Sequence, residues 1–371
     1  MTKGKGTVLI TGANSSLAIP SIQHLLTNYP THNVLLTVRN TNTSDANTQQ
    51  LLKVLSPFPS SRYSLRPLDL SSLSAVQTFA AETKTEIIAG TLEPLVAIIC
   101  NAFKWSITSG LKITSDGYES SMAVNHLAHL SLSLRLLDSF APEGGRIVIL
   151  GSDAHYPGKS GLEKYPPLLP ENLELLVKPE PDKVSEEVGR GFQRYGLSKA
   201  VAIMGMYQLN TRLQKSTSPH LRNITALALD PGGLPDSRCM NSSANIPAAW
   251  TFLMKRILQP LFLGPLAPLF TYFFPSLALR STRDAAVDVV VMAVGDLSRG
   301  DGDREREGGG EGEGGGYGYG GYYGNATRVK LGKEQSSPET RDERIQVEVW
   351  RASLRWVGME RGNTVLEGVF D

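Results

Sequence analysis

The chain has 371 residues, of which 41% are apolar and 20% are charged, an ordinary globular composition that excludes disorder as the dominant state. Its formal charge is +1 at pH 7, so charge alone implies neither a nucleic-acid partner nor an anionic membrane surface. Cys100 and Cys239 have no metal-ligand spacing, so no metal site and no disulfide scaffold are expected, and a reducing compartment fits. Because the polar residues 1–6 leave no room for a signal peptide, we expect a cytoplasmic protein.

Six short β-branched and aliphatic runs alternate with longer amphipathic runs. They predict strands at residues 7–11, 33–38, 64–68, 95–100, 146–150 and 224–229. This alternation is typical of βαβ units, and the almost continuously apolar runs favour parallel strands that are covered by helices on both faces. The predicted fold class is therefore α/β, a doubly wound parallel sheet (Rossmann fold) in a single domain over residues 1–297.

Two stretches interrupt the alternation. Residues 157–192 are rich in proline and glutamate and are predicted to form a long surface excursion. Residues 298–325 are a Gly/Glu/Tyr-rich tract with too few branched apolar side chains to offset the entropy lost on ordering, so we expect a flexible loop. Beyond it, apolar residues at helical spacing predict a short helix over 346–357, and the C-terminal segment 326–371 is expected to pack on the same domain.

The first predicted strand leads into a turn of small residues. Residues 11–18 read Thr-Gly-Ala-Asn-Ser-Ser-Leu-Ala and enter a helical pattern. A strand, a small-residue turn and a helix start form a site for a diphosphate, because free backbone N–H groups and the positive end of the helix face the anion. Turns of this kind are also common loop chemistry, so this octapeptide alone leaves both interpretations open.

A second motif places two titratable groups on one helix face. Tyr195 and Lys199 are four residues apart at the start of a helical run. A nearby cation favours the phenolate and brings the pKa of the phenol toward the range useful for proton transfer. Such pairs are frequent on any helix, but Ser152 follows the fifth predicted strand, at the sheet edge where open α/β sheets build their sites. Its hydroxyl is placed to bind the reacting oxygen.

Together these motifs resemble the short-chain dehydrogenase/reductase family over roughly residues 7–240. The octapeptide is similar to the family's Thr-Gly-x-x-x-Gly-x-Gly pattern, with Ser16 and Ala18 in place of the second and third glycines. Asn, Ser, Tyr and Lys follow in the family's order, and the wide spacing between the serine and the tyrosine is similar to relatives of retinol dehydrogenases and protochlorophyllide reductases. The overall run of motifs looks most like fungal members, many of which serve secondary-metabolite biosynthesis.

The resemblance implies two sets of site residues. The catalytic set is Tyr195, Lys199, Ser152 and Asn125, in which the asparagine supports a proton relay through water and the lysine. The cofactor-binding set is Gly12, Asn14, Ser15, Ser16, Leu17, Arg39, Asp69, Asn101, Tyr195, Lys199, Pro231 and Gly232. Arg39 follows the second predicted strand, where a family member that prefers NAD carries a carboxylate, so the expected cofactor is NADP. The histidines 126, 129 and 155 are expected to be structural.

The substrate is expected to be a lipophilic small molecule. In the family, residues of about 240–280 form a substrate lid, and this stretch is heavy in Leu, Phe, Pro and Trp. Lys255, Arg256 and several prolines disfavour a transmembrane span, whereas a peripheral membrane contact stays open, as does a homo-oligomer. The predicted function is NADP(H)-dependent interconversion of a carbonyl and an alcohol. The alternatives are a 3-ketosteroid or retinol-type dehydrogenase and a catalytically degenerate dinucleotide-binding partner protein.

Overall fold

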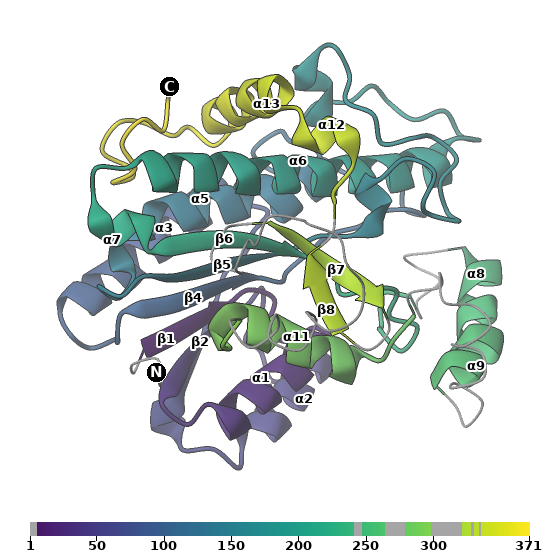
Figure 1. Ribbon diagram of the computed structural model, residues 1–371. Coiled ribbons are helices and arrows are strands. Elements are labelled where there is room, and N and C mark those ends of the chain that lie inside the picture. Colours follow the sequence, from purple (N-terminus) through teal and green to yellow (C-terminus); the bar gives the residue numbers. More distant parts are fainter. Residues whose placement is uncertain (1–5, 241–246, 264–278, 298–320, 328–329, 334) are drawn as a thin grey trace, which may run out of the picture.

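A computed structural model describes residues 6–240, 247–263, 279–297, 321–327, 330–333 and 335–371. Its strands form one eight-stranded sheet in the order β3-β2-β1-β4-β5-β6-β7-β8 (Figure 1). The strands are β1 (Gly6–Ile10), β2 (His32–Val38), β3 (Tyr63–Pro67), β4 (Leu95–Cys100), β5 (Gly145–Leu150), β6 (Ile224–Leu229), β7 (Tyr322–Thr327) and β8 (Lys330–Lys333). The six strands predicted from the sequence are confirmed, each within one residue of its expected bounds.

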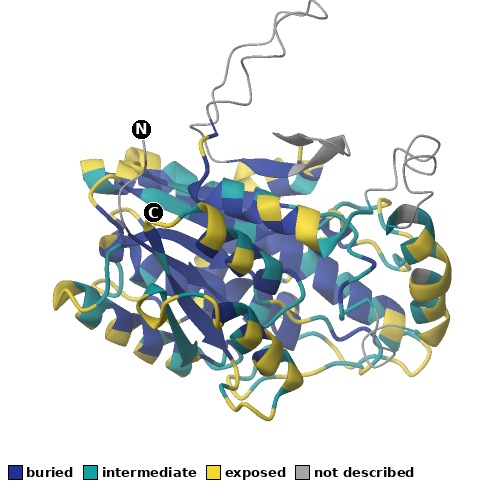
Figure 2. Cartoon of the chain, turned by 90° about the horizontal axis from the view of Figure 1, so that it is seen from below, coloured by how far each residue is buried: buried dark blue, intermediate teal, exposed yellow. Residues whose placement is uncertain are grey.

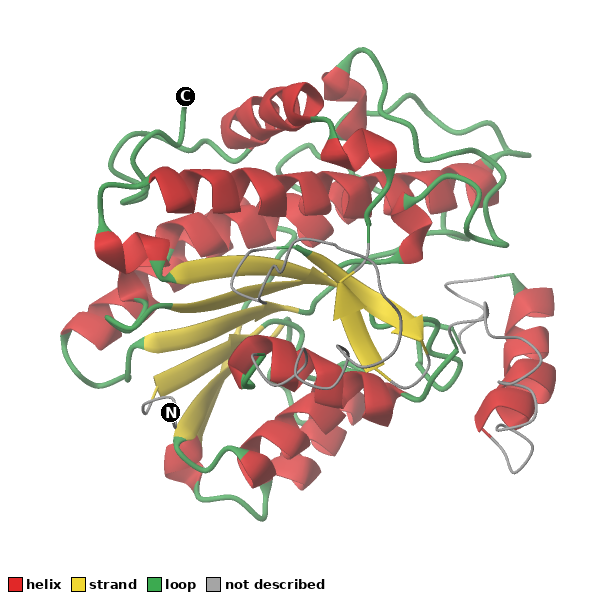
Figure 3. Ribbon diagram, in the orientation of Figure 1, coloured by secondary structure: helices red, strands yellow, loops and turns green. Residues whose placement is uncertain are grey.

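The sheet is parallel from β3 to β7, and only β8 runs antiparallel to its neighbour. Two helical layers cover it (Figures 1 and 3). One layer holds α1 (Ala18–Asn28), α2 (Ala46–Leu55) and α11 (Thr282–Val294). The other holds α3 (Leu73–Ile88), α5 (Ala128–Arg135) and α6 (Glu187–Lys215). This is the doubly wound Rossmann arrangement expected from the apolar strands.

Alternation of side chains along each strand explains why both faces are covered. In β1, Leu9 packs into the core on the α3, α5 and α6 side, while Val8 and Ile10 pack on the α1 and α11 side. All three side chains are at most 1% exposed. Because neither face of the central strands is polar, both must be buried, and Figure 2 shows the sheet as a buried band between partly exposed helices.

The prediction of a flexible loop over 298–325 is wrong at its C-terminal end. Strand β7 begins at Tyr322, inside that segment, and pairs in parallel with β6, while residues 298–320 lie outside the described residues. Tyr322 is 3% exposed and Tyr323 is fully buried. Aromatic side chains favour strands when one sheet face can bury them, and the surrounding glycines hid this signal in the sequence.

Residues 157–192 are also not a surface excursion throughout. Helix α6 begins at Glu187, and Leu176 and Val177 lie in the core. The carboxylate of Asp182 accepts a hydrogen bond of 2.6 Å from the guanidinium of Arg194 on α6, and both side chains are less than 10% exposed. A buried ion pair and an apolar anchor therefore fix this segment against the helix that carries the Tyr-x-x-x-Lys motif.

The described residues form six further helices. They are α4 (Ser120–Met122), α7 (Pro219–Arg222), α8 (Ala248–Leu253), α9 (Gln259–Leu263), α12 (Pro338–Arg341) and α13 (Glu343–Trp356), with π-helical turns at Ala123–Leu127 and Met254–Leu258. Single 3₁₀ turns lie at Ser60–Arg62, Leu137–Ser139, Asp153–His155 and Leu173–Leu176. Within the part of the chain that the structure describes, no helix is both long and apolar enough to span a bilayer. Helices α8 and α9 stand apart from the two helical layers (Figure 1).

The C-terminal helix α13 packs on the outer side of α6. Its Trp350 is 1% exposed, and the indole N–H donates a hydrogen bond of 2.7 Å to the carbonyl of Val369. The guanidinium carbon of Arg212 on α6 lies 4.8 Å from the centre of the Trp350 ring. One side chain thus connects α13, α6 and the last residues of the chain.

We expect Trp350→Ala to lower the free energy of unfolding by about 3–5 kcal/mol, because it removes a large buried side chain and leaves a buried carbonyl unpaired. Urea unfolding followed by circular dichroism measures this change. The exposed Glu348 on the same helix provides the control, since Glu348→Ala should stay within about 0.5 kcal/mol of the parent. Equal effects of the two variants would show that α13 contributes nothing to the core.

Candidate active site

A cleft of about 680 Å³ opens at the carboxyl ends of β1, β4, β5 and β6. Of the predicted site residues, the cleft is lined by Ser15, Ser16, Leu17, Asn101, Ser152, Tyr195, Lys199, Pro231 and Gly232. The others, which lie outside its lining, are Gly12, Asn14, Arg39, Asp69 and Asn125. The structure therefore brings together the turn after β1 and the Tyr-x-x-x-Lys motif, which are about 180 residues apart in the sequence.

The turn after β1 is held against the loop that follows β4. Gly12 has φ of +62°, and a Cβ at this position would lie 2.9 Å from the Cα of Ala102. The side-chain amide of Asn101 donates to the carbonyls of Thr11 at 2.8 Å and Gly12 at 3.1 Å. Only glycine combines this backbone conformation with this close approach, so the first glycine of the motif is required for the shape of the turn.

The hydroxyls of the turn have intramolecular partners. Ser15 Oγ accepts a hydrogen bond of 3.1 Å from the N–H of Ala18, at the start of α1. Ser16 Oγ accepts one of 3.1 Å from the N–H of Arg238, in the loop after β6. The side-chain amide of Asn14 donates to Thr48 of α2 at 3.2 Å, which directs it away from the cleft. The serine that replaces the second glycine thus connects the turn to another loop.

Two predicted cofactor residues lie at the periphery. Arg39 is exposed directly after β2, and within the described part of the chain its guanidinium has no hydrogen-bond or ion-pair partner. The carboxylate of Asp69 accepts bonds from the N–H and hydroxyl of Ser71, at 2.9 and 2.6 Å, in the turn before α3. Arg39 is therefore available to bind an anion, whereas Asp69 stabilises a turn.

Tyr195 forms one wall of the cleft together with three aromatic side chains. Its ring centre lies 5.2 Å from that of Trp105 in an edge-to-face contact, 6.2 Å from Phe192 and 6.3 Å from Phe103. Burial raises the pKa of the phenol above its ordinary range, and a hydrogen bond with Ser152 lowers it by less. The expectation that the neighbouring cation shifts this pKa downward is wrong here, because desolvation is the larger effect. The phenol stays protonated at neutral pH.

Lys199 is buried beside this tyrosine. Its Nζ donates a hydrogen bond of 2.7 Å to the carbonyl of Leu150, the last residue of β5, and lies 5.6 Å from the centre of the Tyr195 ring. Burial lowers the pKa of Lys199 to about 8, and the carboxylate of Asp230 opposes this shift. The ammonium is therefore close to its titration point in the physiological range.

Asn125 acts on the cleft from behind. It lies in the π-helical turn, and its amide group donates to Ser198 Oγ at 2.8 Å and to the carbonyl of Lys104 at 2.9 Å. Its Oδ1 accepts a bond of 2.7 Å from the N–H of Lys104. These bonds hold the loop that carries Phe103 and Trp105. The side chain of Asn125 thereby connects the π-helical turn to this loop and to α6, and its part in a proton relay stays a prediction.

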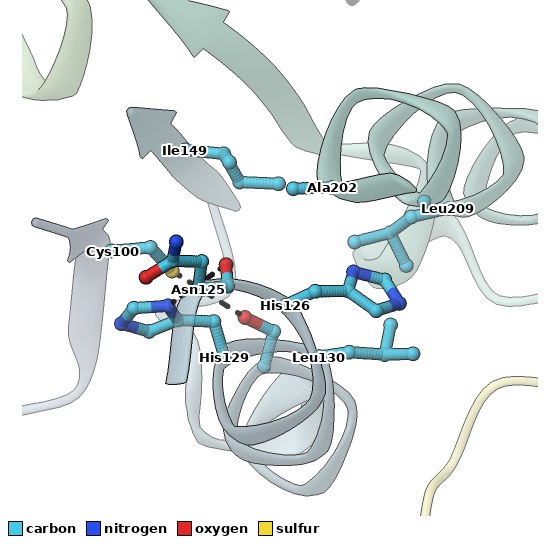
Figure 4. A pocket seen from close by; sticks show the side chains of 10 residues that line it. Cys100, Asn125, His126, His129, Leu130, Ile149, Ala202 and Leu209 are labelled. Carbon is cyan, nitrogen blue, oxygen red and sulfur yellow. Dashed lines mark hydrogen bonds between the residues drawn. The ribbon is translucent and has the colours of Figure 1, made fainter. Parts of the chain in front are cut away.

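A small cavity of about 20 Å³ lies behind Asn125 (Figure 4). His126 and His129 line it, and burial lowers their pKa values to about 3 and about 4. His129 Nε2 contacts Thr11 Oγ1 at 2.9 Å, and His126 Nε2 contacts Ser353 Oγ of α13 at 2.8 Å. Both rings are thus neutral connectors inside the fold. Among the described residues no cluster of side chains could hold a metal ion.

A fungal dehydrogenase resembles this chain over nearly its whole length. No family model matches the chain. The short-chain dehydrogenase iccH of Talaromyces variabilis is 30% identical to it over an alignment of 399 positions, gaps included, that covers 98% of this chain and 98% of that protein. The chain belongs to the short-chain dehydrogenase/reductase family. It is therefore an oxidoreductase.

Two further similarities agree with this assignment. The chloroplastic protochlorophyllide reductase of Chlamydomonas reinhardtii is 29% identical over 248 residues, covering 64% of this dehydrogenase and 57% of that enzyme. The crystal structure of an uncharacterised protein from Mycobacterium paratuberculosis superimposes with a TM-score of 0.61 at 21% identity, covering 96% of this chain and 95% of the other. The latter similarity confirms the fold.

Two carboxyl groups in the cleft of this dehydrogenase were not predicted from the sequence. Asp153 follows Ser152, and partial desolvation in the cleft together with the charge of Asp230 raises the pKa of Asp153 to about 6. Asp230, at the end of β6, accepts bonds from the N–H of Gly232 at 2.8 Å and the hydroxyl of Tyr322 at 3.2 Å. Both acids are visible in the sequence, Asp153 directly after Ser152 and Asp230 at the start of the Asp-Pro-Gly turn. Nothing in the sequence indicates that the two carboxyl groups interact.

Proposed function

We propose that this dehydrogenase interconverts a carbonyl and an alcohol on a lipophilic small molecule, with NADP(H) as the hydride carrier. The observation that carries the proposal is the position of Tyr195, Lys199 and Ser152 on one cleft that also contains the turn after β1. A proton donor and a dinucleotide-binding turn at the carboxyl edge of a parallel sheet are what such a reaction requires.

The turn fits a dinucleotide in shape. At Gly12 the backbone leaves no space for a Cβ, so the chain lies close against the β4 loop, while Ser16 and Leu17 line the cleft. The cofactor would be held by Ser15, Ser16, Leu17, Asn101 and Lys199. Arg39 would bind the 2′-phosphate that distinguishes NADP from NAD. When bound, the nicotinamide supplies or accepts the hydride.

The protein side chains handle the proton. Because the phenol of Tyr195 is neutral, it can donate its proton directly to a carbonyl oxygen that becomes an alkoxide. Ser152, which hydrogen-bonds with the phenol, would hold the same oxygen. The ammonium of Lys199 lies close enough to stabilise the phenolate that remains. In the oxidising direction the same groups would remove the proton of the alcohol.

The lining of the cleft favours an apolar substrate. Phe103, Trp105 and Phe192 surround Tyr195, and Trp250 and Leu258 of the segment after residue 247 also line the cleft. Apolar and aromatic walls around a few polar groups are typical of sites for lipophilic ligands. We extend the proposal to fungal secondary-metabolite biosynthesis in the cytoplasm. The near full-length similarity to a dehydrogenase from the fungus Talaromyces variabilis supports only the fungal part of this extension. Most of the expected lid, residues 241–246 and 264–278, lies outside the described residues.

We expect Arg39→Ala to weaken NADPH binding by about 10–100-fold and to leave NADH binding unchanged, because a charge-assisted hydrogen bond to phosphate contributes about 1.5–3 kcal/mol. Titration of the purified protein, followed by nucleotide fluorescence, measures both affinities. Arg344→Ala is the matched control, since this arginine is 90% exposed on α13, far from the turn. If the parent bound neither nucleotide, the degenerate partner-protein alternative would replace the enzymatic proposal.

A further inference from the structure

Arg238 reaches from the loop after β6 to the opposite side of the cofactor turn. Its backbone N–H donates to Ser16 Oγ at 3.1 Å, and its guanidinium donates to the carbonyl of Asn14. The same guanidinium contacts the side-chain oxygens of Asn47 and, at 3.3 Å, Gln50 on α2. One arginine therefore connects the β6 loop, the turn after β1 and the start of α2.

The guanidinium is a half-buried cation without a bonded counter-charge. Its acceptors are a backbone carbonyl and two amide side chains, and among the described residues no carboxylate forms an ion pair with it. Burial lowers the pKa of Arg238, and Asp45 acts on it only at longer range. A partly desolvated charge that is satisfied by neutral oxygens alone is less well compensated than one bonded to an anion.

The loop is anchored just before this residue. The carboxylate of Asp236 accepts bonds from the N–H and hydroxyl of Thr282, at the start of α11, at distances from 2.9 to 3.1 Å. The backbone of the loop is thus fixed on α11, while the side chain of Arg238 extends over the turn after β1. Arg238 can therefore exchange its hydrogen-bond partners by side-chain rotation without rebuilding the loop.

We propose that Arg238 is a phosphate ligand of the dinucleotide site, which gives up its neutral acceptors when a phosphate group enters the cleft. Arg238, Ser16 and Asn47 all line the cleft, so an anion there lies within the same pocket as the guanidinium. A planar guanidinium binds phosphate with two parallel hydrogen bonds, which replaces weaker neutral contacts. This inference rests on the proposed function. It also assigns a role to the serine at the second glycine position, which holds the backbone of Arg238.

Nucleotide binding would also join the loop after β6 to the cofactor. In its present conformation the arginine bridges the turn and α2. When the guanidinium N–H groups donate to a phosphate instead, Arg238 contacts the bound cofactor in place of the turn and α2. The loop after β6 is then joined to the cofactor. Because Cys239 and Met240 next to it also line the cleft, nucleotide binding would shape the substrate side of the pocket.

The test is the affinity of Arg238→Gln for NADPH and for NADH, measured by nucleotide fluorescence beside the parent. We expect a loss of at least about tenfold, and partial recovery in Arg238→Lys, which keeps the charge. Equal loss for both nucleotides assigns the diphosphate as the partner, whereas loss for NADPH alone assigns the 2′-phosphate. The dependence of binding on salt should also become shallower in the glutamine variant, because one phosphate contact is gone.

Gln50→Ala distinguishes a phosphate ligand from a structural brace. It removes one neutral acceptor of Arg238 and lies outside the cleft lining, so nucleotide affinity should stay within twofold of the parent or increase. Parent-like affinity of Arg238→Gln for both nucleotides would overturn the inference and leave the proposed function intact. The inference would also be overturned, and the proposed function left intact, if Gln50→Ala weakened nucleotide binding as much as Arg238→Gln. A parent protein that binds neither nucleotide overturns both.

Discussion

Tyr195→Phe is expected to reduce turnover by about 10²–10⁴-fold while nucleotide affinity stays within a few-fold of the parent. The substitution keeps the ring that packs edge-to-face on Trp105 and removes only the hydroxyl that bonds with Ser152. Because the phenol is buried and protonated, it can act as the proton donor, and phenylalanine at this position has no proton to give. Steady-state kinetics on a lipophilic ketone and fluorescence titration with NADPH measure the two quantities.

The matched control lies on the same helix. Tyr207→Phe also removes one hydroxyl from α6, but that hydroxyl bonds Ser336 Oγ at 3.0 Å, away from the cleft. We expect the turnover of Tyr207→Phe to remain within about twofold of the parent. Turnover of Tyr195→Phe within a few-fold of the parent would refute the proton-transfer role, and equal losses in both variants would point to a disturbed helix instead.

The core of the fold was predictable because its signal is local. The central parallel strands are buried on both faces, so strands such as β1 and β4 are almost continuously apolar in the sequence. Strand β7 escaped prediction because its stability comes from pairing with β6, about 95 residues away in the chain, and from burial of Tyr322 and Tyr323. Its own segment is glycine-rich and carries no alternation. Long-range pairing of this kind leaves no local pattern.

The candidate site also combines features with a local signal in the sequence and features that depend on long-range contacts. Tyr195 and Lys199 were predictable because helical spacing puts them on one face, and Ser152 because it follows the end of a strand. The contact of Arg238 with the cofactor turn spans more than 220 residues, and the coupling of Asp153 with Asp230 depends on two separate strand ends. The direction in which the pKa of Tyr195 shifts was not predictable either, since it depends on how deeply the phenol is buried, which the sequence does not give.

Lys199→Met is expected to lower turnover by about 10²–10³-fold and to change how stability depends on pH. The methionine is similar in length and apolar, so it can occupy the same buried position. The pKa of Lys199 falls from 10.5 to about 8 on folding, so between these pH values the unfolded chain binds more protons than the folded one. Stability of the parent therefore rises with pH across this window.

The size of this effect follows from the shift. A change of one pKa unit corresponds to about 1.4 kcal/mol, so the parent should gain about 3 kcal/mol relative to Lys199→Met between pH 8 and 10.5. Urea unfolding of both proteins at several pH values measures the difference, in which the titration of other groups largely cancels. A difference that stays constant with pH would mean that the ammonium is solvated in the folded protein. The expected rise would show that the fold keeps a destabilising cation at this site, and a loss of turnover in Lys199→Met would show that the chemistry needs it.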